Sequence, residues 1–205
     1  MSSTKSLAVL PLAVMLLAVL AGCTAAETPK ETPTPTASEA PVASATPEPV
    51  ALKFTMPTDC NAILPESRVD AFTADGIVLL GGPGGLYGSD YLADATPEEQ
   101  AGGISCIWGF ADSEVSSFTI SVAPLSAATR PAVIESFAEQ GLNEDLAGDA
   151  VTYGVQGDRT LDPAIMNVLR GDSWISVIAT IGGTDSYNQS VEIAQEVHDL
   201  VYTAG

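Results

Sequence analysis

Apolar and polar residues alternate along several short segments of the second half of the chain, which is the pattern of half-buried β-strands. The clearest example is 117–123, where every second residue is large and apolar. The turn-forming residues 111–114 separate it from another apolar segment at 104–110, so these two segments predict a β-hairpin. Further strands are predicted at 76–80, 150–156, 164–170 and 174–181.

Other segments carry the signals of helices. A short helix is predicted at 58–64, ending before Pro65, and a second at 131–140, which opens with a proline and stops at a glycine. A helical turn is expected from Pro97, and a final helix at 187–202. The apolar stripe predicted for this last helix consists of Val191, Ala194, Val197 and Val201.

Together these elements predict an α+β domain with an antiparallel sheet of about five strands, helices packed on one face and one disulfide. Parallel doubly wound folds do not fit, because strands and helices do not alternate regularly. Trp108 and Trp174 fall in predicted strands, so both are expected in the core.

The amino-terminal segment has the features of an export signal. Lys5 precedes an apolar run from Leu7 to Leu20, which is shorter than the roughly 20 residues of a membrane-spanning helix. We therefore interpret residues 1–22 as a signal peptide. An uncut membrane anchor is the other interpretation, since no charged residue lies between Ser6 and Ala26.

The run ends in Leu20-Ala21-Gly22-Cys23, which resembles the lipobox of bacterial lipoproteins. The resemblance implies cleavage before Cys23 and a diacylglycerol on its thiol. Such a lipid would hold the protein at the cell membrane, facing the extracytoplasmic side, without a spanning helix.

Residues 24–50 are rich in Pro, Thr, Ala and Glu and contain no aromatic side chain. Such a composition cannot bury enough apolar surface to offset the entropy of ordering. We therefore predict a lipidated cysteine followed by a disordered tether over 23–53, and one extracellular domain over 54–205. About 150 residues suffice for a single core.

Charge excludes one class of partner. The chain has 7 Lys and Arg against 26 Asp and Glu, a net charge of −19, so it lacks the basic surface that nucleic-acid binding requires. The acidity favours solubility and attraction of cations or basic partners.

Cysteine usage predicts one disulfide. With Cys23 assigned to the lipid, Cys60 and Cys106 remain as an even pair in an oxidising compartment, and we expect them to be bridged. The alternative, a catalytic or metal-binding thiol, lacks partners, because the chain has no CxxC motif and only His198. We predict no metal and no cofactor.

The early Cys60 and the Cys106-Ile107-Trp108 motif resemble those of small secreted lipoproteins of actinobacteria. Similar patterns occur in extracellular sensor-type domains of actinobacterial membrane kinases. The resemblance covers about 58–202 and implies a disulfide-tied domain on the cell envelope that binds a ligand or partner. The glycine-rich segment 81–88 departs from those domains.

The same segment fits neither GxGxxG nor a phosphate-binding loop, so it does not predict nucleotide binding. Tyr87 and Tyr91 beside it are predicted to contact a ligand or partner, since tyrosine offers an apolar face and a polar tip. Ordinary packing at the rim of the domain is the alternative.

Catalysis has weaker support. There is no GxSxG motif, and His198 is expected on the surface of the last helix. Acidic side chains in or near predicted loops leave paired-carboxylate hydrolysis open. These are Asp90, Asp94, Glu98, Glu99, Glu144, Asp145 and Asp149.

The sequence therefore predicts a lipid-anchored envelope protein whose monomeric domain binds a protein or envelope component without catalysis. A cell-wall hydrolase that uses loop carboxylates is one alternative. A small solute-binding lipoprotein is another, although such proteins usually use two lobes and this chain has room for one.

Overall fold

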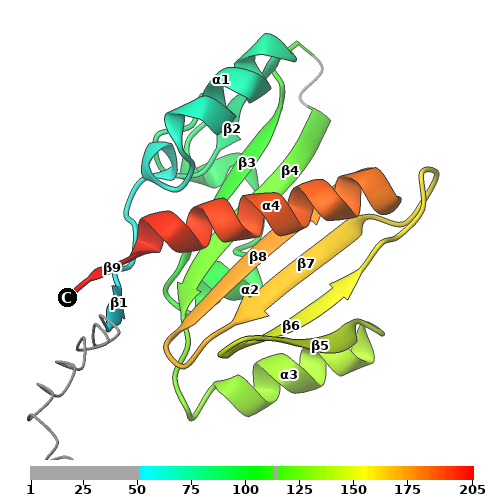
Figure 1. Cartoon of the computed structure of the whole chain (residues 1–205). Helices are drawn as coiled ribbons and strands as arrows, with labels where there is room; N and C mark the ends of the chain where they lie inside the picture. Colours follow the sequence, from blue (N-terminus) through cyan, green and yellow to red (C-terminus); the bar gives the residue numbers. More distant parts are fainter. Residues whose placement is uncertain (1–50, 113–114) are drawn as a thin grey trace, which may run out of the picture. The chain divides into compact units, whose positions relative to one another are not determined.

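Figure 1 shows a computed structural model of the chain, which describes residues 51–112 and 115–205. Its main element is a seven-stranded antiparallel sheet in the order β2-β3-β4-β8-β7-β6-β5. The strands are β2 (Ile77–Gly81), β3 (Ile104–Phe110), β4 (Val115–Pro124), β5 (Asn143–Ala147), β6 (Ala150–Val155), β7 (Ala164–Leu169) and β8 (Ser173–Ala179). A separate two-stranded sheet pairs β1 (Leu52–Phe54) with β9 (Tyr202–Ala204).

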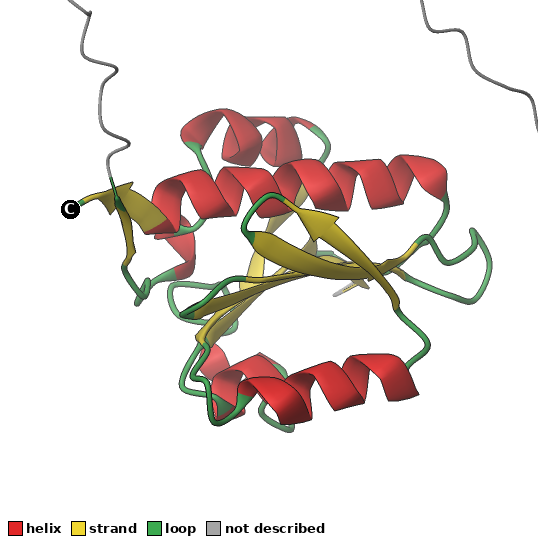
Figure 2. Ribbon diagram, turned by 60° about the horizontal axis from the view of Figure 1, so that its bottom comes forward, coloured by secondary structure: helices red, strands yellow, loops and turns green. Residues whose placement is uncertain are grey.

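Helices cover both faces of the large sheet (Figure 2). On one face lie α1 (Glu66–Ala74) and α4 (Thr184–Val201), and on the other lie α2 (Pro97–Gln100) and α3 (Arg130–Glu139). The α+β class, the antiparallel pairing and the disulfide are confirmed. The predictions of about five strands and of helices on a single face are wrong.

The reason lies in the central strands, which are buried on both sides. Six of the seven residues of β8 are buried, so helices on one face alone would leave every second residue in water. The missed edge strand β5 has the sequence NEDLA and is exposed throughout. Its pairing with β6 holds it in place, and its side chains provide no alternating signal.

Two apolar clusters fill the space on the two faces. The first lies under α1 and α4 and includes Phe72, whose ring stacks on Phe118 at 5.3 Å between centroids. The second lies under α3 and includes Phe137. Trp108 belongs to the first cluster and Trp174 to the second, which confirms that both are core residues.

The predicted helix at 58–64 is wrong in its position. Only Cys60–Ala62 forms a short 3-10 helix, and the true helix α1 begins after Pro65. Pro65 has a φ of −67° and stands just before the first helical residue, where a missing N–H costs nothing. A proline that looks like a stop is therefore the start of the next helix.

The disulfide joins Cys60 to Cys106, with 5.5 Å between the two Cα atoms. It connects the short 3-10 helix to the middle of β3, and both cysteines are fully buried. The bond therefore ties the segment before α1 to the centre of the first core.

Several other elements agree with the pattern of the sequence. The hairpin of β3 and β4 is confirmed, as are α3 and the turn of helix at Pro97. The last helix is confirmed but starts earlier, at Thr184. Val191 does not belong to its buried stripe, because it is 40% exposed. The buried residues of α4 are Ser190, Ile193, Ala194, Val197 and Val201.

None of the helices in the described part of the chain is both long and apolar enough to span a bilayer. The predicted signal peptide, the lipobox cysteine Cys23 and most of the predicted tether lie outside the described residues.

Candidate functional site

A row of polar side chains crosses the sheet face that α2 and α3 cover. Residues directly opposite one another in an antiparallel sheet project to the same face. Four such residues, on β3, β4, β8 and β7, are Ser105, Ser121, Ser176 and Asn167. All four are buried, so this row is a polar strip inside the protein. It continues through Tyr153 on β6 to Glu144 on β5.

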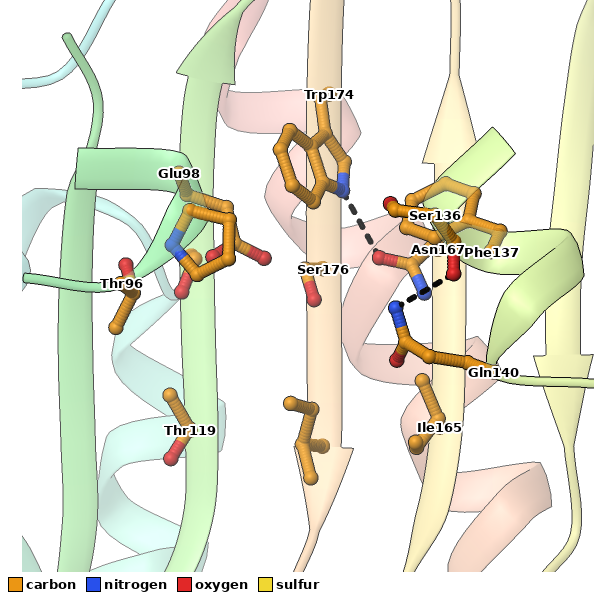
Figure 3. A pocket seen from close by; sticks show the side chains of 13 residues that line it. Thr96, Glu98, Thr119, Ser136, Phe137, Gln140, Ile165, Asn167, Trp174 and Ser176 are labelled. Atoms are coloured by element: carbon orange, nitrogen blue, oxygen red, sulfur yellow. Dashed lines mark hydrogen bonds between the residues drawn. The ribbon is translucent and has the colours of Figure 1, made fainter. Parts of the chain in front are cut away.

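Hydrogen bonds hold the row in a defined arrangement. The hydroxyl of Ser105 lies 2.8 Å from that of Ser121 and 2.6 Å from that of Thr96. On the other side, Nε1 of Trp174 donates to Oδ1 of Asn167 at 2.9 Å. Because an indole N–H can only donate, this bond determines which way the amide points. The NH2 group of Asn167 is turned toward the α3 side of the site (Figure 3).

The short helix α2 carries Glu98 to the edge of this row. A capping box starts the helix: the N–H of Glu99 donates to the hydroxyl of Thr96 at 3.2 Å, and Oε2 of Glu99 accepts from the N–H of Thr96 at 2.8 Å. The N–H of Gly103 donates to the carbonyl of Glu98 at 2.8 Å, which closes the far end. Glu98 is only 6% exposed, and its carboxyl group extends toward Ser176 (Figure 3).

A cavity of about 260 Å³ lies between α2 and α3, and three members of the polar row, Ser121, Ser176 and Asn167, line it. Its lining residues are Thr96, Pro97, Glu98, Thr119, Ser121, Ser136, Phe137, Gln140, Ile165, Asn167, Trp174, Ser176 and Ile178. Glu98 is the single ionisable residue among them. The volume lies just below the range of about 300–1,000 Å³ for drug-sized ligands, so the cavity suits a small molecule.

Burial raises the pKa of the Glu98 carboxyl, because the charged form loses its water. Hydrogen bonds from its own backbone N–H, Ser176 and Thr96 act in the opposite direction, and the charge of Glu99 adds to the increase. Ionisation of a buried acid costs the fold stability, so such a residue needs another reason to be present. A buried acid with a shifted pKa in a concave, partly polar site is typical of a functional position.

Glu98→Gln is therefore expected to increase the free energy of unfolding at neutral pH. The folded protein binds the carboxyl proton more tightly than the unfolded chain does, so the wild type loses stability as the pH rises above the ordinary Glu value of 4.5. The neutral amide has no such loss. Urea unfolding at several pH values should show a difference that opens above this value and closes below it. Equal pH dependence in the two proteins would contradict this account of Glu98.

Tyr87 and Tyr91 lie together, with their rings stacked at 5.8 Å, but they do not line the cavity. Tyr87 lies in the loop after the edge strand β2, and Tyr91 ends the short 3-10 helix Ser89–Tyr91 that follows. A Cβ atom on Gly81 would lie 2.5 Å from Cβ of Tyr91, so the latter packs directly on the strand backbone. Tyr87 is 43% exposed. Their predicted contact with a partner stays a prediction.

Among the seven acids considered for hydrolysis, Glu98 is the one that lines the cavity. Glu144 accepts a hydrogen bond from the hydroxyl of Tyr153 at 2.8 Å, and Asp149 pairs with Arg170. No group of three or more metal-ligating side chains occurs in residues 51–112 and 115–205.

His198 is not the surface residue that its position near the chain end suggests. Its side chain is 12% exposed, and its ring stacks on Tyr202 at 4.8 Å between centroids. Nδ1 lies 2.9 Å from Oδ1 of Asp199. Since α4 covers the opposite face of the sheet, His198 is not available to the hydroxyl groups of the polar row.

A second, wider hollow of about 510 Å³ lies beside Asp158, but the Asp158 carboxylate has a structural role there. The carboxylate of Asp158 accepts hydrogen bonds from the N–H groups of Thr160 and Leu161, both at 2.7 Å. These bonds lower the pKa of Asp158 and stabilise its own turn. The carboxylate is therefore committed to local structure.

Sequence reasoning missed the polar row and the location of Glu98 within it. A signal was present, since each of four strands places one Ser or Asn between apolar neighbours. The strand order that aligns these residues was not predictable from alternation alone.

Comparison with protein families, curated proteins and solved structures finds no match to this chain. A function must therefore be inferred from the pocket and from the amino-terminal pattern.

Proposed function

We propose that the protein is a lipid-anchored binding protein of the cell envelope and that its domain holds a small polar molecule in the cavity between α2 and α3. The observation that carries this proposal is the buried polar row beneath that cavity. Serine and asparagine side chains at the centre of a sheet lose water on burial, and the hydrogen bonds within the row offset only part of that cost. A ligand that uses their hydrogen-bonding groups would account for their presence.

The lining of the cavity combines apolar and polar side chains as small-molecule binding sites do. Phe137, Ile165 and Ile178 supply apolar surface, while Glu98 and Asn167 supply a few directed polar groups. Small-molecule sites are mostly apolar with a small number of placed polar groups, which give orientation and specificity. This geometry favours a small solute over a protein partner and needs only one domain.

The composition of the cavity also favours binding over hydrolysis. Hydrolysis by paired carboxylates uses two acids about 5–10 Å apart, and the lining of this cavity has one. The base that lies beside Ser176 is Glu98 itself, whose carboxyl group accepts a hydrogen bond from the serine hydroxyl. A Ser-His-Asp arrangement would need a histidine between serine and carboxylate, and His198 is on α4, which covers the opposite face of the sheet.

The envelope location rests on the amino-terminal pattern. The apolar run and the lipobox-like Leu20-Ala21-Gly22-Cys23 support a lipid on Cys23, and the Pro/Thr-rich segment after it would act as a tether. A disulfide in the folded domain is consistent with an oxidising compartment.

Trp174 provides a direct test, because the chain has two tryptophans and only this one lines the cavity. The Trp108→Phe variant isolates its fluorescence, and this change removes an indole N–H that is buried without a hydrogen-bond partner. We expect a saturable change in Trp174 emission on adding at least one of four probes: phenethylammonium, 2-phenylethanol, phenylacetate or glucose. The full chain should be used.

Ser136→Phe in the same background is expected to abolish the response, because it fills the cavity from α3. Ala132→Phe adds the same ring to an exposed position of α3 and should leave the response intact. If none of the four probes changes the emission, or if Ser136→Phe responds as the control does, the proposed pocket function is wrong.

A further inference from the structure

The Glu98 carboxyl group has no cation beside it within the described residues. The ion pairs of the domain involve Arg68, Arg159, Arg170 and His198, and Glu98 belongs to none of them. Arg130, near the start of α3, donates instead to the carbonyl of Arg170. The groups that bond to the Glu98 carboxyl are neutral donors.

The negative charge of a buried carboxylate is only partly compensated when all of its hydrogen-bond partners are neutral. Neutral hydrogen bonds compensate only part of the water that an ionised carboxylate loses, whereas a cation held against it adds a charge-assisted hydrogen bond. The cavity borders this carboxyl group directly, so a ligand has access to it. A positively charged group at that point would complete the site.

The rest of the lining suits the body of an organic cation. The rings of Phe137 and Trp174 meet edge to face at 5.6 Å, and aromatic walls attract ammonium groups and bury hydrocarbon. No basic side chain occurs in the lining, so a ligand carboxylate or phosphate would find no charged partner. The net charge of −19 also raises the local concentration of cations around the protein.

We infer that the pocket selects small organic cations, with an ammonium or amidinium group of the ligand paired to Glu98 and its apolar part against Phe137 and Trp174. This inference rests on the proposed function of the pocket. It adds the charge of the ligand, which the proposed function leaves open.

The test compares three molecules of nearly equal size and different charge: phenethylammonium, 2-phenylethanol and phenylacetate. Titration of the full chain, followed by calorimetry and Trp174 emission, should show the cation binding at least about tenfold more tightly than the alcohol. Phenylacetate should bind more weakly than both. Glu98→Gln should reduce cation affinity by about tenfold or more and leave alcohol affinity within about twofold.

Glu99→Gln is the matched control. It removes one negative charge at the neighbouring position, and glutamine still completes a capping box with Thr96. The control should bind the cation as the wild type does. Since Glu98 must be ionised to pair, wild-type affinity for the cation should increase with pH across the range in which Glu98 titrates, while Glu98→Gln shows no such increase. The negative charge of Glu99 raises the pKa of Glu98. The Glu99→Gln control therefore also measures how much this charge contributes to the pH dependence of cation binding.

Two results would overturn the inference while leaving the pocket function intact. One is that the alcohol or phenylacetate binds as tightly as phenethylammonium or more tightly, and that Ser136→Phe blocks this binding. The other is undiminished cation affinity in Glu98→Gln. Failure of every probe would instead contradict the proposed function itself.

Discussion

Replacing both Cys60 and Cys106 with alanine is expected to lower the free energy of unfolding by about 4 kcal/mol. The bond spans 46 residues of sequence, and a cross-link of that span restricts the unfolded chain by an amount of this order. For a domain of about 150 residues, this corresponds to a decrease of melting temperature on the order of 10 °C. Thermal and urea unfolding of the full chain would measure both quantities.

Reduction of the wild-type protein is the matched control, because it breaks the bond and leaves both side chains in place. The reduced protein and the alanine variant should show similar losses. Both should depend more steeply on urea than the oxidised wild type, since an unfolded chain without the cross-link exposes more surface. A variant that melts within about 2 °C of the oxidised wild type would show that the bond adds little to stability.

How far sequence reasoning reaches depends on whether a residue's role is local. The β3–β4 hairpin and α3 follow from signals within a few residues of each other, and both are present. The edge strand β5 depends on β6 for its conformation, and nothing within NEDLA indicates a strand. Coverage of both faces likewise depends on which strands lie at the centre, and this is a property of the whole sheet.

The candidate site shows the same limit. Glu98 was among the acids considered, and the capping signal of α2 was in the sequence as Thr96-Pro97-Glu98-Glu99. The distinction between the two neighbouring glutamates comes from packing: Glu99 turns back to cap the helix, while Glu98 is buried against the sheet. A local pattern predicts the helix turn but not which of its carboxyl groups faces a cavity.

Gly103 connects that packing to stability and to the pocket. It lies between α2 and β3, and its N–H donates to the carbonyl of Glu98 at 2.8 Å. A Cβ atom at this position would collide with the carbonyl oxygen of Val122 and lie 2.7 Å from the carbonyl oxygen of Glu98. Both carbonyl oxygens are backbone atoms, one on β4 and the other on α2, and Cβ of Ala123 is a third obstacle at 2.7 Å. The short helix can approach the sheet this closely only because the residue is glycine.

Gly103→Ala is therefore expected to lower the free energy of unfolding by about 3 kcal/mol, since overpacking of this kind forces backbone shifts. The shift should move α2 outward, so cation affinity at Glu98 should decrease together with stability. Gly102→Ala separates strain from collision: its φ is +88° but its nearest neighbour lies 3.8 Å away, so about 1 kcal/mol is expected. Gly171→Ala meets open space and should cost nothing. Equal free energies of unfolding for Gly103→Ala and Gly171→Ala, measured with urea, would contradict this account. The close packing of α2 on β4 would then not be what holds Glu98 over the polar row.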